Sequence, residues 1–258
     1  MTDPDIEYPE IVYKKKWISA RRKLLKKEKE FTKARDTLNA ERRRLPMVKI
    51  DKDYEFHGPE GNVHLLDLFE DRLQLIIYHF MFDPDWDQGC TSCSAWADQI
   101  ARGHLNHLNS RSTTLALVSR APFHKLQAFK KRMGWTTPWY SSFNNKFNYD
   151  FHVTQDESVA PVQYNYRDKT TLEHLGQYYH TKGEQPGISC FLRDGDDIFH
   201  TYSTYGRGME AAGDANHFLD LTALGRQEEW EKPEERVTGL GAIAGSKKIL
   251  YPDQYNQD

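Results

Sequence analysis

Two cysteines stand three residues apart at the point where an apolar run gives way to a helical pattern. Residues 73–82 read LQLIIYHFMF, a continuous run typical of a central strand that is buried on both faces. Cys90 and Cys93 come next, and a helical pattern extends from about 91 to 109. Unpaired backbone N–H groups and the helix dipole favour a thiolate at such a helix start. The spacing therefore predicts redox chemistry, with Cys90 as the exposed nucleophile and Cys93 as the more buried resolving thiol.

The remaining pattern predicts the fold that carries this pair. A second apolar run at 113–119 precedes a helical pattern across 122–134, so the order strand, helix, strand, helix indicates parallel strands. Residues 188–204 contain two strand-like runs that flank an Asp-Gly turn, which predicts a hairpin. A final helix is expected near 209–220. We expect an α/β protein with a thioredoxin-like fold, in which helices flank a central mixed sheet.

A long helical arm is predicted before this domain. Residues 14–45 contain neither proline nor glycine, and Pro46 ends the pattern. Five apolar side chains recur at seven-residue intervals, the spacing of a coiled coil: Trp17, Leu24, Phe31, Leu38 and Leu45. We expect an arm over 1–46, a thioredoxin-like domain over 47–225 and a polar tail over 226–258.

Charge is distributed unevenly between the arm and the rest of the chain. Residues 14–44 contain fourteen Lys/Arg and four Asp/Glu, a net charge of +10. Because the whole chain carries −3, the rest carries −13. Aromatic side chains for stacking are sparse in the arm and no nucleic-acid motif accompanies the charge, so an acidic protein surface is favoured over a nucleic acid. We expect a homodimer that forms through this helix; a monomer whose helix folds back onto its own acidic body is the alternative.

Composition bounds the class of protein. Hydrophobic residues make up 38% of the 258 residues, enough for a packed core. No window approaches the roughly eighteen consecutive apolar residues of a membrane span, and the first residues do not form a signal peptide. Three cysteines do not make a disulfide framework, and a close pair in a reducing compartment is more often catalytic or metal-binding. We expect a cytoplasmic protein without membrane contact.

Several features compete with the redox interpretation. Asp83, Asp85 and Asp87 precede Cys90 closely, and their charges oppose thiolate formation. Residues 83–89 resemble a calcium loop, but the glycine comes one place late and no closing glutamate follows. The Pro-x-x-x-Thr/Ser-x-x-Cys pattern of peroxiredoxins precedes neither cysteine. Two buried, unreactive cysteines are a further alternative.

A metal site is the main alternative function. Cys90 and Cys93 with His79 or His200 would give a mixed sulfur and nitrogen site suited to copper or zinc. A structural zinc site needs two further ligands, which only folding could supply. His79 lies in a buried run, where a hydrogen-bonded core histidine is the usual explanation. The redox mechanism itself needs no cofactor.

Three residues are predicted to contact the thiol or disulfide substrate. Pro186 precedes the strand that begins at 188, a position at which thioredoxin-like proteins present backbone to an extended substrate; an ordinary strand-start proline is the alternative. Trp86 lies in the loop before Cys90. Arg207 follows the aromatic segment at the end of the hairpin and is a candidate anion contact, with a surface arginine as the alternative.

The motifs together resemble one family. The run YHFMF-x-PDW-x-x-GC-x-SCS-x-WAD, with 191-FLRDGDDIFHTYSTYGRG-208 and 219-LDLTALGRQEEW-230, is similar to an uncharacterised, mainly bacterial family of thioredoxin-like proteins. Its members are described as dithiol–disulfide oxidoreductases largely because of their fold. This family carries a "domain of unknown function" label. The resemblance covers about 14–230 and implies a thioredoxin-like fold with Cys90 and Cys93 as the redox pair. It implies no particular substrate. The chain departs from the family pattern at Thr91, Cys190 and Gly206, so a redox potential is not carried over.

Overall fold

The computed structural model describes residues 9–212, 221–222 and 250–254. The described residues fall into two units, 9–46 with 221–222 and 47–212 with 250–254, and each unit is described by itself. None of the described helices is long and apolar enough to cross a membrane. The helix expected near 209–220 lies mostly outside the described residues, which show a 3-10 helix, η3, over Gly206–Ala212. The predicted tail over 226–258 also lies outside them except for residues 250–254.

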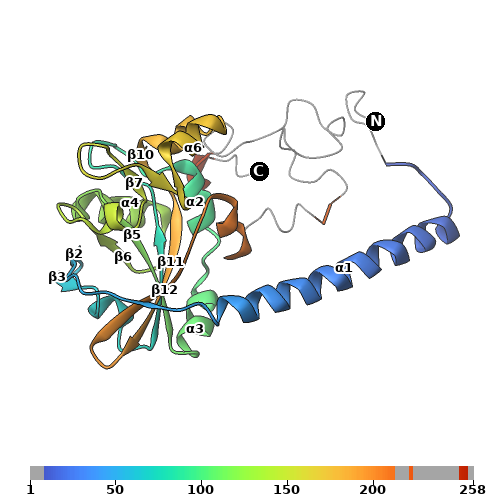
Figure 1. Cartoon of the computed structure of the whole chain (residues 1–258), viewed down its shortest axis with the longest axis horizontal. Helices are drawn as coiled ribbons and strands as arrows, with labels where there is room; N and C mark the ends of the chain where they lie inside the picture. The colour runs from blue at the N-terminus through green and yellow to red at the C-terminus, as the bar shows by residue number, and fades with distance from the viewer. Residues whose placement is uncertain (1–8, 213–220, 223–249, 255–258) are drawn as a thin grey trace. The chain divides into compact units, whose positions relative to one another are not determined.

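The first unit contains one uninterrupted helix, α1, over Lys14–Arg42 (Figure 1). The prediction of a single long helix is confirmed, and it ends three residues earlier than expected. None of its residues is buried. The five apolar residues at seven-residue spacing are each between 52% and 67% exposed: Trp17, Leu24, Phe31, Leu38 and Leu45. The first four of these residues lie on α1, so its apolar side is not covered within its own unit.

The second unit is built on an eight-stranded sheet with the order β1-β12-β11-β4-β5-β6-β2-β3. Its strands are β1 Val48–Lys49, β2 Glu55–Gly58, β3 Gly61–His64, β4 Gln74–His79, β5 Thr113–Ser119, β6 Trp139–Ser141, β11 Gly187–Asp194 and β12 Asp197–Tyr205. Strands β4, β5 and β6 run parallel, while β11 is antiparallel to both β4 and β12. Two small sheets pair β7 Thr154–Gln155 with β10 Gly183–Glu184, and β8 Gln163–Tyr164 with β9 Arg167–Asp168.

Helices connect these strands as the sequence pattern predicts, with one correction. The helices are α2 Thr91–Ala97, α3 Arg102–Asn109, α4 Phe123–Met133, α5 Phe147–Asp150 and α6 Lys169–His174. The prediction of a single helical segment over about 91–109 was wrong. Ala101 adopts an extended conformation, so α3 starts after it as a separate helix. α4 ends where Gly134 takes a left-handed conformation, which glycine adopts without steric cost.

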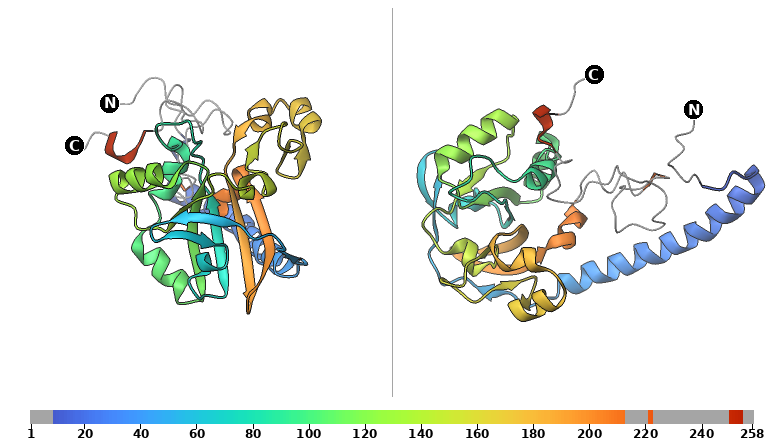
Figure 2. Two further views of the ribbon diagram at one scale, coloured as in Figure 1. Left: turned by 90° about the vertical axis from the view of Figure 1, so that its left-hand side faces the viewer. Right: turned by 90° about the horizontal axis from the view of Figure 1, so that it is seen from above.

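Four strands define the fold class. β4 and β5 are parallel neighbours connected through α2 and α3, and the hairpin β11–β12 adds antiparallel strands on the other side of β4 (Figure 2). The predicted hairpin turns at Gly195, whose φ is 57°. The strand order β5-β4-β11-β12, with helices following β4 in the chain, is that of a thioredoxin-like fold. The predicted fold class is confirmed.

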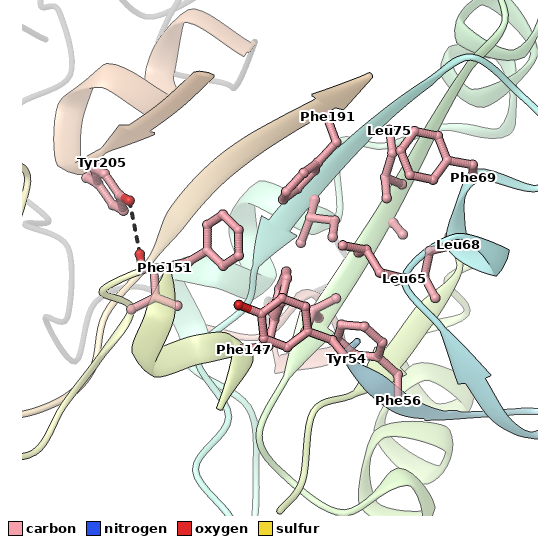
Figure 3. Close-up of a cluster of buried hydrophobic side chains, with 14 of the residues drawn as sticks. Tyr54, Phe56, Leu65, Leu68, Phe69, Leu75, Phe147, Phe151, Phe191 and Tyr205 are labelled. Atoms are coloured by element: carbon pink, nitrogen blue, oxygen red, sulfur yellow. Dashed lines mark hydrogen bonds between the residues drawn. The ribbon is translucent and has the colours of Figure 1, made fainter. Parts of the chain in front are cut away.

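The sheet separates two clusters of buried side chains. One contains Leu75 and Ile77 of β4 together with phenylalanines 147, 151 and 191 (Figure 3). The other contains Tyr78 of β4, Cys93 of α2 and side chains of α4. Successive side chains of a strand point to opposite faces, so β4 contributes to both clusters. This strand is therefore buried on both sides, as its continuous apolar run predicts.

Candidate active site at Cys90 and Cys93

The two cysteines lie at the start of α2. Cys90 is the N-cap residue, and its N–H donates to the Met81 carbonyl at 3.0 Å. Cys93 lies in the first turn, where it is 2% exposed, whereas Cys90 is partly exposed. Gly89 permits this loop to pass close to Phe80, because a Cβ at position 89 would lie 2.6 Å from that ring. All three cysteines are free thiols.

The thiols of Cys90 and Cys93 differ in acidity. A hydrogen bond from the Cys93 thiol is the main cause that lowers the pKa of Cys90 to about 7; burial opposes it, and the N–H groups of Cys93 and Ser92 add to it. Burial, followed by the hydrogen bond to Cys90, raises the pKa of Cys93 well above its ordinary value. The thiol of the partly exposed Cys90 is therefore the one that ionises first, as a nucleophile must.

The acidic residues before Cys90 are not the main influence on the pKa of its thiol. Asp83 Oδ2 accepts a hydrogen bond from Arg120 Nη2 at 2.8 Å, so its charge is paired. Its Oδ1 accepts the backbone N–H of Asp85 at 2.9 Å. The largest influences on the Cys90 pKa are hydrogen bonds and burial rather than these carboxylates. The ion pair of Asp83 with Arg120 thus weakens the charge repulsion that the sequence predicts against a thiolate at Cys90.

One guanidinium group joins the two loops that flank the thiol pair. Besides Asp83, Arg120 donates from Nε to Glu184 Oε1 at 2.6 Å and from Nη1 to the Tyr149 hydroxyl at 2.9 Å. The Glu184 side chain is only 1% exposed, and it also accepts from Thr154 Oγ1. Glu184 lies two residues before Pro186. Arg120 therefore connects the loop that leads to Cys90 with the segment that leads to Pro186.

Aromatic side chains surround the pair. The Tyr78 ring stacks on Trp96 of α2 at 4.0 Å between centroids, and its hydroxyl is hydrogen-bonded to the Cys93 sulfur. The pKa of Tyr179 is raised to about 12, mainly by partial burial and then by the charges of Cys90 and Cys93. The Tyr164 hydroxyl donates to the Pro186 carbonyl at 2.8 Å. The surroundings of the two thiols are therefore rich in phenol rings.

The predicted substrate contacts lie on three separate segments. Pro186 directly precedes β11 and is partly exposed. Trp86 is 37% exposed in the loop before Cys90, and its carbonyl accepts from Lys125 Nζ at 2.9 Å. Arg207 lies in η3, where its Nε donates to Glu210 at 3.0 Å. Contact of these three residues with a substrate stays a prediction.

The histidines of the alternative metal site lie away from the cysteines. His79 is 1% exposed and packs against Phe147 and Phe151, on the face of the sheet opposite Cys93. Its Nε2 is hydrogen-bonded to Ser189, which is linked through Ser203 to His200. The structure therefore brings His79 and His200 together but not with the cysteines. Within the described ranges, no three His, Cys, Asp or Glu side chains are grouped to hold a metal ion.

Residues far apart in the sequence complete this site, and no local sequence pattern indicated them. Alternation along residues 73–82 could have placed Tyr78 and His79 on opposite faces. Arg120 comes directly after the buried strand β5, a position at which side chains gather at the sheet edge. Tyr179 carries no local signal. Cys190 was expected to be a small core residue; it lies on β11 opposite Ile76 and is only partly buried, at the edge of the second cluster.

Fold and site together define a thioredoxin-like protein with a dithiol at a helix start. A family model described as "Bacterial protein of unknown function (DUF899)" matches residues 6–245, and the chain belongs to this family. The resemblance expected from the motifs is thereby confirmed.

Solved structures similar to this chain include several peroxiredoxins. A peroxiredoxin Q mutant from Xanthomonas campestris is 10% identical, with a TM-score of 0.43 and coverage of 65% of this chain and 92% of that chain. Peroxidoxin BcpB from Mycobacterium tuberculosis is 11% identical, with a TM-score of 0.36 and coverage of 62% and 85%. No protein in a search of curated sequences matches.

Proposed function

We propose that this protein is a thiol–disulfide oxidoreductase in which Cys90 attacks and Cys93 resolves. The observation that supports it best is the asymmetry of the pair, since Cys90 is partly exposed with a lowered pKa while Cys93 is buried with a raised one. A thiol pair with one accessible thiolate and one buried partner suits two successive exchange steps. We propose a cytoplasmic setting, in which such a pair is kept available as a dithiol.

The reaction would proceed through a mixed disulfide. The Cys90 thiolate attacks one sulfur of the substrate disulfide, the substrate S–S bond breaks, and the first thiol leaves. Cys93 then attacks Cys90, the bond between Cys90 and substrate breaks, and the second thiol leaves. The enzyme finishes with a Cys90–Cys93 disulfide, which a thiol reductant returns to the dithiol. Pro186, Trp86 and Arg207 are proposed to contact the substrate during the first step.

Peptide mapping after mild oxidation tests the pairing. We expect one dominant disulfide between Cys90 and Cys93 that dithiothreitol reverses, because the two lie within one turn of α2. A Cys190→Ala variant should form the same bridge and serves as the matched control. A dominant bridge that includes Cys190 would contradict the assignment. Copper or zinc bound stoichiometrically to the reduced protein, and lost in Cys90→Ala, would favour the metal-binding alternative.

We further propose that α1 mediates formation of a homodimer. Its apolar side chains are exposed within its own unit, and each large one that becomes buried contributes roughly 1.5–3 kcal/mol. The segment carries +10 while the rest of the chain carries −13, so the complementary partner is the acidic part of a second copy.

Sedimentation of the full-length protein measures this association. We expect a dimer for the native chain and a monomer for the variant with Leu24→Asn and Phe31→Asn, which removes two apolar contacts. The matched control replaces two exposed threonines of the same helix, Thr32→Asn and Thr37→Asn, and should remain a dimer. If the native chain sediments as a monomer, or if the native chain, the variant and the control all sediment as the same dimer, α1 does not mediate assembly.

A further inference from the structure

A buried phenol lies beside the resolving cysteine. Tyr78 is 2% exposed, and Cys93, with which its hydroxyl is hydrogen-bonded, is equally buried. Trp96, three residues after Cys93 on the same helix, stacks on the Tyr78 ring with an angle of 11° between the planes. This stacking holds the Tyr78 ring against the helix that carries Cys93.

The direction of this hydrogen bond follows from the acidities. Burial is the main cause that raises the pKa of Tyr78 well above its ordinary value, so the phenol keeps its proton and acts as donor. Cys93 in turn donates to the Cys90 sulfur. The three groups form a chain of donors, from Tyr78 to Cys93 to Cys90. Such chains polarise each successive bond.

We propose that Tyr78 is a catalytic residue, the hydrogen-bond donor that stabilises the Cys93 thiolate while it attacks the mixed disulfide. This inference rests on the proposed function. Once Cys90 is bonded to substrate, its sulfur no longer carries the negative charge that accepts a hydrogen bond from the Cys93 thiol. Cys93 must then ionise in a buried apolar cluster, where an unpaired charge is costly. The Tyr78 hydroxyl is placed to donate to that charge.

The balance of the step is complete without a further reactant. The Cys93 proton leaves and the resulting thiolate attacks the Cys90 sulfur. An S–S bond forms between Cys93 and Cys90 as the bond from Cys90 to the substrate sulfur breaks. The substrate thiolate takes up one proton, while Tyr78 keeps its own throughout. In this step Cys93 is oxidised and one substrate sulfur is reduced; over both steps, two cysteine sulfurs are oxidised and two substrate sulfurs are reduced.

The aromatic disulfide 5,5′-dithiobis(2-nitrobenzoate) separates the two steps, because each releases one coloured thiolate. We expect Tyr78→Phe, which keeps the stacked ring, to leave the first release nearly unchanged and to slow the second by about tenfold or more, the loss expected for a hydrogen bond to a charged group. All variants would carry Cys190→Ala, so that the third thiol does not contribute.

Two controls make the result specific. Tyr54→Phe removes the hydroxyl of a tyrosine in the other cluster, which is 5% exposed and donates to Asp150, and should change neither release. Cys93→Ala should give only the first release. Equal second releases in Tyr78→Phe and the native protein, or a parallel loss of both releases, would overturn the role of Tyr78. A native protein that gives no second release would instead overturn the proposed function.

Discussion

Replacing Cys90 with alanine is expected to abolish disulfide reduction, whereas replacing Cys93 is expected to stop the reaction after its first step. Cys90 is the partly exposed thiol with the lowered pKa, so no other described cysteine can substitute for it as nucleophile. Without Cys93 the mixed disulfide has no resolving thiol and accumulates. Turnover of a peptide disulfide with dithiothreitol, and mass spectrometry of the trapped adduct, measure both effects.

The same assignment predicts the pH dependence of alkylation. Iodoacetamide reacts with the thiolate, so the rate at Cys90 should rise with pH around a midpoint near 7. Cys93→Ala removes the main hydrogen-bond donor and should move this midpoint upward. Cys190→Ala is the control and should leave turnover and midpoint unchanged. Faster alkylation of Cys93 than of Cys90, or full turnover in Cys90→Ala, would reverse the proposed roles.

Arg120→Met is expected to lower the free energy of unfolding by about 3–5 kcal/mol near neutral pH, the usual cost of leaving one member of a buried ion pair unpaired. Glu184 would keep its carboxylate in a site where its side chain is 1% exposed. Urea unfolding of the variant and the native protein measures the difference. Arg132→Met is the matched control, because its ion pair with Asp253 is much more exposed and should cost at most about 1 kcal/mol.

This loss should depend on pH in a defined direction. Burial is the main cause that raises the pKa of Glu184, and Arg120 opposes this shift. Without Arg120 the pKa of Glu184 rises further in the folded state, so folding favours the protonated form. The penalty is therefore full above the folded pKa and disappears toward the unfolded value of about 4.3. We expect a smaller loss at pH 5 than at pH 8; an equal loss at both would contradict this explanation.

Local patterns in the sequence determined much of the scaffold. The continuous apolar runs predicted the buried strands β4 and β5, and the Asp-Gly dipeptide predicted the hairpin β11–β12. The spacing of Cys90 and Cys93 predicted a helix start, which the structure shows at Thr91. These features depend on neighbours within one turn or one strand, so the sequence reports them directly. The helix break at Ala101 was not predicted, because the apolar periodicity of the sequence continues across this residue.

Only the tertiary structure decided what surrounds the two thiols. Arg120 meets Glu184 across 64 residues of sequence and Asp83 across 37, and no periodicity relates these positions. It also decided that His79 and Cys93 lie on opposite faces of the sheet, which separates a histidine from thiols that the sequence placed close together. The sequence by itself determined which residues could do chemistry. Their partners depended on long-range packing, because burial and pairing arise only when distant segments meet across the sheet.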